Sequence, residues 1–320
     1  MSASTGPAST FGPPLPVLSY SPVVLSVPGR PVDLQVRVSA PETGTDLPVI
    51  LFSHGHGPSN NLSSLNGYQP LANFWAAHGF VVVQPTHLSS RTLSRQLAGA
   101  SGAPFFWRSR AEDMTHILDR LDEIENAVPG LAGRINHDKV AVAGHSLGGF
   151  TAGLLLGTGI NDPDTGEQVS LIESRIKTGV LLAAPGRGGD ALTGYMAKQT
   201  PFFRTTDFST MTTPTLVVAG EKDSLTHFTD LGPVWFTDPY TFAPSPKTLL
   251  TLFGAQHGLG GIAGYDAAET TDENPDLVAA LGRLTTAYLR SRLHPGDTAW
   301  QRACDALATD PHPVGRVESK

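Results

Sequence analysis

The stretch Val140-Ala141-Val142-Ala143-Gly144-His145-Ser146-Leu147-Gly148-Gly149 decides the fold. Its small and β-branched apolar residues predict a buried parallel strand, and the apolar residues 150–156 predict a helix immediately after it. A Gly-x-Ser-x-Gly turn between a strand and a helix is the setting that exposes a serine as a nucleophile. Glycines are expected on both sides because side chains there would collide with the neighbouring strand and helix. We therefore predict that Ser146 is a nucleophile, beside the free N–H groups that begin the helix.

The composition indicates a globular enzyme that does not bind nucleic acid. The chain has 320 residues, of which 40% are hydrophobic and 16% are charged, enough to bury a large core. A net charge of −7 without any basic run argues against phosphate-backbone partners. The single cysteine, Cys304, excludes an intramolecular disulfide and a cysteine-rich metal site. No stretch approaches the ~18 apolar residues of a membrane span. A small-molecule substrate is the remaining expectation.

The predicted organisation is one large domain behind a short arm. Residues 1–20 are rich in Ser, Pro, Thr and Gly and are expected to form a flexible or partly ordered arm. The arm lacks the features of a signal peptide, so a cytoplasmic location is expected. Residues 21–320 are expected to form a single domain with loop insertions near 86–107, 185–213 and 228–246.

The pattern of elements predicts a mostly parallel sheet with helices on both faces. Residues 23–27 and 32–38 read as an antiparallel edge pair. Buried strands are expected at 47–53, 80–83, 140–145, 179–184, 215–219 and, last in the chain, 248–253. Helices are expected at 65–78, at about 107–127, and from near 274 onward. In such sheets reactive groups gather at the carboxyl ends of the strands. Polar candidates stand at those ends, at residues 54–57, 144–148, 221–223 and 257.

These motifs resemble the α/β-hydrolase superfamily over most of the chain. Residues 144–149 resemble its nucleophile elbow, and residues 51–57 resemble its His-Gly-x-Gly loop. The chain order Ser146, Asp223, His257 is also the order of that superfamily. The elbow is most similar to the branch of dienelactone hydrolases, platelet-activating-factor acetylhydrolases, chlorophyllase-like esterases and bacterial polyester hydrolases. The resemblance implies an α/β fold and a serine hydrolase that needs no cofactor.

The resemblance also implies a role for each residue of the site. His257 would be the general base and Asp223 would hold its imidazole. The backbone N–H groups of His56 and Leu147 would form the oxyanion hole. Asp190, which follows the strand at 179–184, is a rival for the acid. Asp223 is favoured because it follows its strand directly, whereas Asp190 follows a Gly-Arg-Gly-Gly loop.

The neighbouring histidines and aromatic residues have more modest interpretations. His54 and His56 could chelate a metal, but further ligands are not apparent nearby, so no metal is expected. His145 is expected to pack beside the nucleophile or to position it. Phe106, Trp107 and Trp235 stand in irregular segments after strands, so they are candidate substrate contacts, and packing into the core beneath the loops is the alternative.

The predicted substrate is a carboxylic ester with an apolar moiety. Lactones, thioesters and polyesters belong to the same chemistry. Two alternatives stay open: an amidase or peptidase with the same triad, and a non-catalytic binding protein of the same fold. The sequence does not indicate the oligomeric state.

Overall fold

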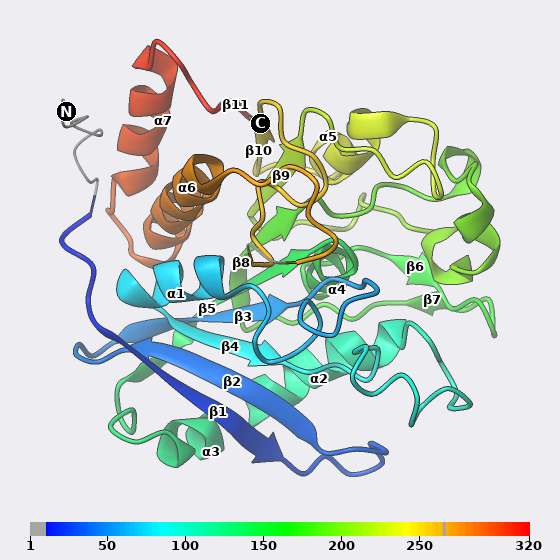
Figure 1. Ribbon diagram of the computed structural model, residues 1–320, viewed down its shortest axis with the longest axis horizontal. Helices are drawn as coiled ribbons and strands as arrows, with labels where there is room; N and C mark the ends of the chain where they lie inside the picture. The colour runs from blue at the N-terminus through cyan, green and yellow to red at the C-terminus, as the bar shows by residue number, and fades with distance from the viewer. Residues whose placement is uncertain (1–10, 265–266) are drawn as a thin grey trace.

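A nine-stranded sheet in the order β1-β2-β4-β3-β5-β8-β9-β10-β11 forms the centre of the molecule (Figure 1). The computed structural model describes residues 11–264 and 267–320. Its strands are β1 (Val17–Leu25), β2 (Leu34–Pro41), β3 (Leu47–Ser53), β4 (Val81–Pro85), β5 (Ile135–His145), β8 (Ile176–Leu182), β9 (Thr215–Gly220), β10 (Lys247–Leu252) and β11 (Gly315–Ser319). From β4 to β10 neighbouring strands are parallel, whereas β1, β2 and β11 are joined to the sheet by antiparallel pairing. A separate hairpin pairs β6 (Ile160–Asn161) with β7 (Gln168–Val169).

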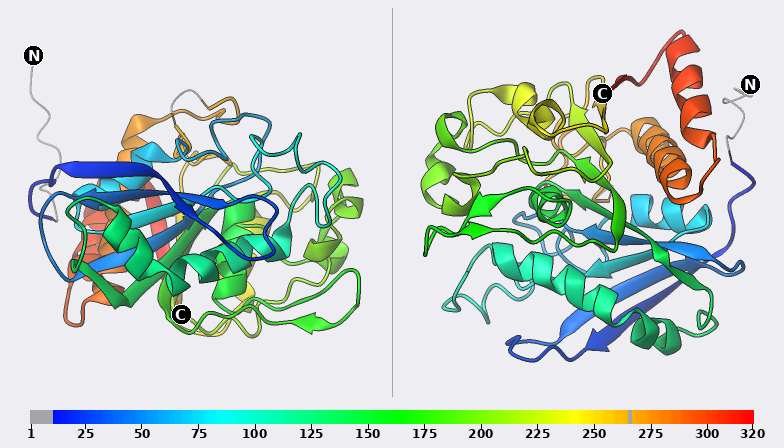
Figure 2. Two further views of the ribbon diagram at one scale, coloured as in Figure 1. Left: turned by 90° about the horizontal axis from the view of Figure 1, so that it is seen from below. Right: turned by 180° about the vertical axis from the view of Figure 1, so that it is seen from behind.

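Helices cover both faces of the sheet (Figures 1 and 2). The α-helices are α1 (Gln69–Ala77), α2 (Trp107–Asp119), α3 (Leu121–Ala127), α4 (Leu147–Leu155), α5 (Asp238–Phe242), α6 (Pro275–Leu293) and α7 (Ala299–Thr309). Helices α1 and α6 pack together on one face, and α2 and α4 pack together on the other. Short 3-10 turns are η1 (Gly189–Ala191), η2 (Tyr195–Lys198), η3 (Pro201–Phe203) and η4 (Gly232–Thr237).

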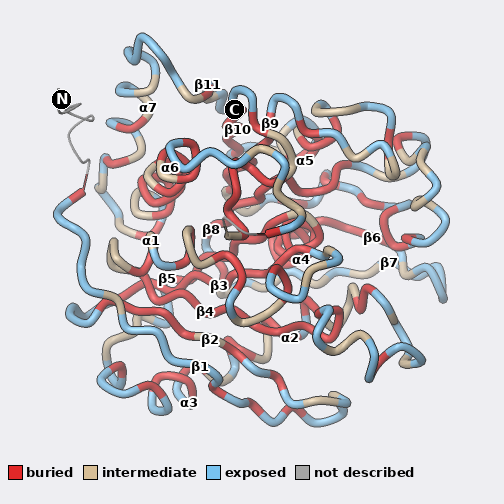
Figure 3. The backbone as a smooth tube through the Cα atoms, in the orientation of Figure 1, coloured by how far each residue is buried: buried red, intermediate tan, exposed pale blue. Residues whose placement is uncertain are grey.

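The core lies along the parallel strands and α4, the helix that follows Ser146 (Figure 3). Every residue of β3, β4, β9 and β10 is buried, as expected for strands covered on both faces. Every residue of α4 is buried as well, because α4 lies between the sheet and α2. The predicted fold class, a mostly parallel sheet with helices on both faces, is confirmed.

Several element boundaries differ from the prediction. The helix expected at 107–127 is divided at Arg120, whose backbone (φ −125°, ψ 25°) leaves the helical region. The helix expected at 65–78 begins only at Gln69, because Tyr68 has a left-handed backbone. The strand at 247–252 is not the last, since β11 pairs with it. The charged, partly exposed sequence of β11 gives little apolar pattern to recognise.

The predicted arm and loops have mixed structure. Residues 1–10 of the arm lie outside the described residues, and residues 17–20 belong to β1. Among the predicted insertions, 86–106 forms successive turns, 185–213 holds η1, η2 and η3, and 228–246 holds η4 and α5. Within the described residues, none of the helices combines the length and apolarity needed to cross a membrane.

Candidate active site

Ser146 stands at a sharp turn between β5 and α4. Its backbone lies at φ 54° and ψ −121°, a strained conformation for a residue with a side chain. A Cβ on Gly144 would lie 2.0 Å from the carbonyl oxygen of Gly148, and a Cβ on Gly148 would lie 2.0 Å from that of Ser53. The Ser146 N–H donates to the Leu182 carbonyl at 2.9 Å. Both glycines are therefore required by close backbone approach, and the turn is fixed to the end of β8.

His257 and Asp223 reach Ser146 from the ends of neighbouring strands. Nε2 of His257 lies 2.9 Å from Oγ of Ser146, and Nδ1 lies 3.0 and 3.1 Å from the two carboxylate oxygens of Asp223. Nδ1 therefore carries the proton that is donated to the carboxylate, and Nε2 is free to accept from the serine hydroxyl. Asp223 is fully buried, and this burial raises the pKa of its carboxyl while the hydrogen bond from His257 opposes the rise.

The structure leaves the rival acid apart from this group. Asp190 is exposed in η1, and among the described residues it forms no hydrogen bond or ion pair with His257. Glu221, another carboxylate after β9, is exposed and accepts the Gly254 N–H at 3.0 Å.

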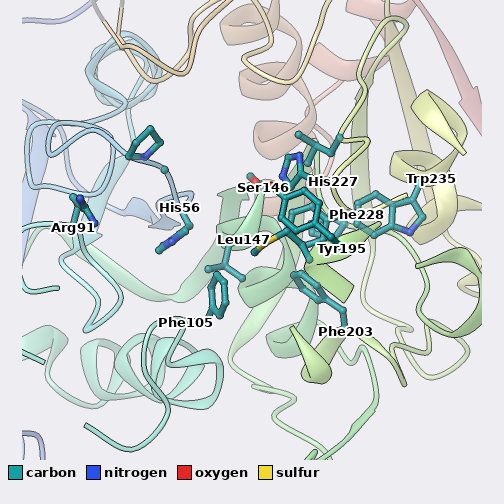
Figure 4. Close-up of a pocket in the computed structure, with 15 residues that line it drawn as sticks. His56, Arg91, Phe105, Ser146, Leu147, Tyr195, Phe203, His227, Phe228 and Trp235 are labelled. Carbon is teal, nitrogen blue, oxygen red and sulfur yellow. The ribbon is translucent and has the colours of Figure 1, made fainter. Parts of the chain in front are cut away.

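His56 and Leu147, the two predicted oxyanion donors, both lie beside the pocket over Ser146. Both line the pocket that contains Ser146 (Figure 4). Leu147 is the first residue of α4, so its N–H belongs to the unpaired donors of a helix start. The His56 ring packs against Phe105 with ring centres 5.1 Å apart. Burial lowers the pKa of His56 to about 4, so this ring is neutral at pH 7.

A chain of hydrogen bonds joins the loop of His56 to the backbone of His257. The Gly55 N–H donates to the Tyr68 hydroxyl at 3.0 Å, and this hydroxyl donates to Nδ1 of His145 at 2.8 Å. Nε2 of His145 in turn donates to the His257 carbonyl at 2.7 Å. Burial lowers the pKa of His145 to about 3, so the ring is neutral and its one proton stays on Nε2. Each donor in this series of hydrogen bonds therefore points from Gly55 toward His257. The sequence indicated a positioning role for His145 but gave no signal for Tyr68.

Arg110 of α2 is a second connection that the sequence analysis missed. Its fully buried guanidinium donates to Oγ of Ser53 at 3.1 Å and to the carbonyl of His54. It also donates to Oγ of Ser89 at 2.5 Å and to the Thr151 hydroxyl at 2.9 Å. That hydroxyl donates to the Leu147 carbonyl at 3.0 Å. Arg110 thus joins the loop after β3 to the first turn of α4, and burial lowers its pKa to about 9.

A second serine–histidine–aspartate set lies beneath this loop. Nε2 of His87 is 2.9 Å from Oγ of Ser53, and Nδ1 is 2.9 Å from Oδ2 of Asp113. The other oxygen of Asp113 pairs with Nε of Arg30 at 2.9 Å. Ser53, His87 and Asp113 are all buried, and none of them lines the pocket over Ser146. This set supports the sheet edge on which the loop of His56 rests.

The pocket over Ser146 has a volume of about 420 Å³ and a largely aromatic wall (Figure 4). Trp235, one of the predicted substrate contacts, lines this pocket, although its side chain is almost wholly covered. Phe105 lines it in place of the two predicted neighbours. Phe106 instead lines an adjoining cavity of about 260 Å³, and Trp107 stacks on Phe202 at 6.4 Å. Phe105 and Phe106 line different cavities because Phe106 has a left-handed backbone (φ 47°), which turns its ring away from the pocket over Ser146.

The possible metal ligands lie elsewhere. Among the described residues, Asp122, Glu125 and His137 form the one group of such side chains close enough to share an ion. Glu125 already accepts two backbone N–H groups, from Arg134 and Ile135. Nδ1 of His54 is bonded to the Gly55 carbonyl at 2.7 Å, so His54 and His56 do not form a chelating pair.

Comparison with known protein families finds a similarity in the first part of the chain. Residues 23–162 match the family model described as chlorophyllase. The match contains the loop of His56 and the elbow of Ser146 and ends before Asp223 and His257. None of the curated proteins matches the chain significantly. The chain is thus similar to the chlorophyllase family and has the α/β-hydrolase fold, as predicted from its motifs.

Proposed function

We propose that this chain is a cofactor-independent serine hydrolase that cleaves carboxylic esters through an acyl-enzyme on Ser146. The observation that carries the proposal is the continuous contact of Ser146, His257 and Asp223 beside an apolar pocket. A serine hydroxyl reacts poorly unless a base accepts its proton, and Nε2 of His257 is 2.9 Å away with its lone pair free. The similarity to the chlorophyllase family supports an ester as the substrate class.

In the first step, Oγ of Ser146 attacks the ester carbonyl carbon and its proton passes to Nε2 of His257. The carbonyl oxygen becomes an oxyanion, which the N–H groups of Leu147 and His56 would stabilise. The C–O bond to the alcohol then breaks, and His257 returns the proton to the departing oxygen. Asp223 stabilises the imidazolium that exists between these two proton transfers.

In the second step, water releases the acid. A water molecule gives a proton to Nε2 of His257 and attacks the acyl carbon. The bond to Oγ of Ser146 breaks, and Oγ takes the proton back from His257. The same oxyanion donors act in both steps, and loss of one such donor typically costs ~100- to 1000-fold in rate.

The proposal is tested by covalent labelling and by a matched panel of substrates. A fluorophosphonate probe should label the protein once, and Ser146→Ala should abolish both the labelling and the release of p-nitrophenol from p-nitrophenyl butyrate. p-Nitrobutyranilide, the matched amide, should be cleaved far more slowly, which separates an esterase from an amidase. Asp223→Asn should lower kcat by about 10⁴, as expected when the imidazole loses its orienting carboxylate.

Asp190→Asn is the matched control for the acid, since it removes the same charge from an exposed turn. Its activity should equal that of the unaltered protein. Unchanged ester turnover in Ser146→Ala would overturn the proposal. Loss of activity in Asp190→Asn but not in Asp223→Asn would overturn the choice of acid.

A further inference from the structure

Two cavities meet at Ser146, and the positions of Leu147 and His257 tell them apart. The first is the pocket of about 420 Å³ described above, which includes Leu147 but not His257. The second has a volume of about 460 Å³ and includes His257 but not Leu147. We refer to them as the Leu147 cavity and the His257 cavity. They share Ser146 and His56, so one bound molecule can occupy both.

The proposed mechanism fixes which part of an ester enters each cavity. His257 must give its proton to the oxygen of the leaving alcohol, so the alcohol lies on the side of His257. The oxyanion points to the N–H groups of Leu147 and His56. The acyl chain is then directed to the remaining side, which is the Leu147 cavity. This assignment rests on the proposed function.

The wall of the Leu147 cavity is apolar. Phe105, Phe203, Trp235 and Met196 line it, and none of them lines the other cavity. The aromatic rings form a connected surface, with Phe203 and Phe228 centred 5.8 Å apart and Phe228 stacked on Trp235 at 6.1 Å. Of the side chains lining this cavity, only Arg91 is formally charged, and it is exposed at the far end from Trp235 (Figure 4).

The His257 cavity is lined in part by polar side chains, beside apolar ones such as Leu62, Leu225 and Phe228. The side chains that line this cavity alone include Lys222, Ser224, Gln256, Glu269, Thr270 and Thr271. Gln256 accepts a hydrogen bond from the Thr271 hydroxyl at 2.8 Å through its oxygen, which leaves its amide nitrogen as a donor. Such groups cost free energy when an apolar chain covers them and gain it when a hydroxyl pairs with them.

The geometry points to a divided substrate: an ester whose acid part is apolar and whose alcohol part carries hydroxyl groups. The Leu147 cavity is in the size range of sites for ring-sized or medium-chain groups. The Lys222 and Gln256 side chains would pair with the hydroxyls of a polyol. A hydroxyl is therefore favourable on one side of the scissile bond and unfavourable on the other.

Matched esters test this division directly. Propyl hexanoate is the reference. Glyceryl 1-monohexanoate adds two hydroxyls to the same three-carbon alcohol, and propyl 6-hydroxyhexanoate adds one hydroxyl to the end of the acid. The acid released is titrated at constant pH, and each kcat/KM is divided by the rate of hydroxide-catalysed hydrolysis of the same ester. This correction removes differences in intrinsic reactivity.

We expect the glyceryl ester to react about tenfold faster than the reference, as one or two new hydrogen bonds would give. The hydroxyacid ester should react about tenfold slower, because its hydroxyl enters an apolar cavity. Gln256→Met should reduce the preference for the glyceryl ester and keep the penalty on the hydroxyacid ester. Met196→Gln should reduce the penalty on the hydroxyacid ester and keep the preference for the glyceryl ester. Each variant therefore serves as the control for the other.

The outcomes separate this inference from the proposed function. If Ser146 is required for turnover but both hydroxylated esters react like the reference, or the preferences are reversed, the division is wrong and the esterase proposal stands. If no ester is cleaved in a Ser146-dependent reaction, the proposed function itself fails.

Discussion

Replacing Tyr68 with phenylalanine tests whether the loop that contains His56 and the proposed general base, His257, are held together. The change removes one oxygen atom, which accepts from the Gly55 N–H and donates to Nδ1 of His145. The ring itself can stay in place, because it packs against Phe52 at 4.8 Å through carbon atoms that phenylalanine retains. Tyr68 is only 1% exposed, so water cannot readily replace the lost hydroxyl.

Two buried polar groups are then left without partners. Each such group costs about 1–3 kcal/mol, so the free energy of unfolding should fall by about 2–6 kcal/mol. His145 also loses the donor that fixes its tautomer, and its hydrogen bond to the His257 carbonyl becomes less well oriented. Because small misplacements of catalytic groups are costly, kcat should fall about ten- to hundredfold, with a smaller change in KM.

Urea unfolding and the hydrolysis of p-nitrophenyl butyrate at 25 °C measure both effects. The kinetics are measured where the variant is fully folded, so a loss of kcat cannot come from unfolded protein. Tyr240→Phe is the control, since among the described residues the Tyr240 hydroxyl makes no hydrogen bond and its ring meets Lys320 at 5.2 Å. A change of less than about 0.5 kcal/mol in stability, together with kcat within twofold, would refute the reasoning.

Three further changes probe the site and its support. Gly148→Ala places a Cβ 2.0 Å from a backbone oxygen, so we expect insoluble protein or a melting temperature at least about 6 °C lower by calorimetry. Arg110→Met leaves several buried oxygens without a donor and should cost about 2–4 kcal/mol in urea unfolding and lower kcat. A well-folded, fully active variant would contradict the bridging role. Acid should destabilise the protein below about pH 6.5, because burial lowers the pKa values of His54, His56, His87 and His145. The folded state then binds fewer protons than the unfolded state as pH falls. Asp113, whose pKa is raised to about 6, opposes this only in part, so the free energy of unfolding should still fall between pH 6.5 and pH 5.5. Equal urea midpoints at pH 5.5 and 7.5 would contradict this.

The parts of the site that could be predicted depend on short segments. The elbow needs glycines within two residues of Ser146, and each polar strand end stands directly after its own apolar run. Parallel pairing then brings these ends together without further sequence information. Asp223 and His257 meet for this reason, although they are far apart in the chain.

The supporting residues depend on contacts that no local pattern describes. Tyr68 meets His145 across 77 positions of sequence. Arg110 did leave a signal, because it stands on the same stripe of α2 as Met114 and Ile117, where a charge is costly unless it is paired. A charged residue at an apolar helix position was therefore the sign of a buried network.

The aromatic contacts were the hardest to predict. Phe105 and Phe106 are adjacent in an irregular segment, where no period of the sequence decides which ring faces the cavity. The backbone of Phe106 decides it, and this backbone conformation follows from the fold around it.

The buried Ser53–His87–Asp113 set affects how loss-of-function variants are interpreted. Within residues 11–264 and 267–320, two serine–histidine–aspartate sets have nearly equal interatomic distances. Substitutions in either set are expected to abolish turnover. Those in the Ser146 set remove the proposed catalytic groups, and those in the Ser53 set remove the support beneath the loop that contains His56. Activity assays alone would therefore suggest two nucleophiles in one protein. Counting the labelled sites with a covalent probe, together with a folding measurement, distinguishes the proposed nucleophile, Ser146, from the buried Ser53.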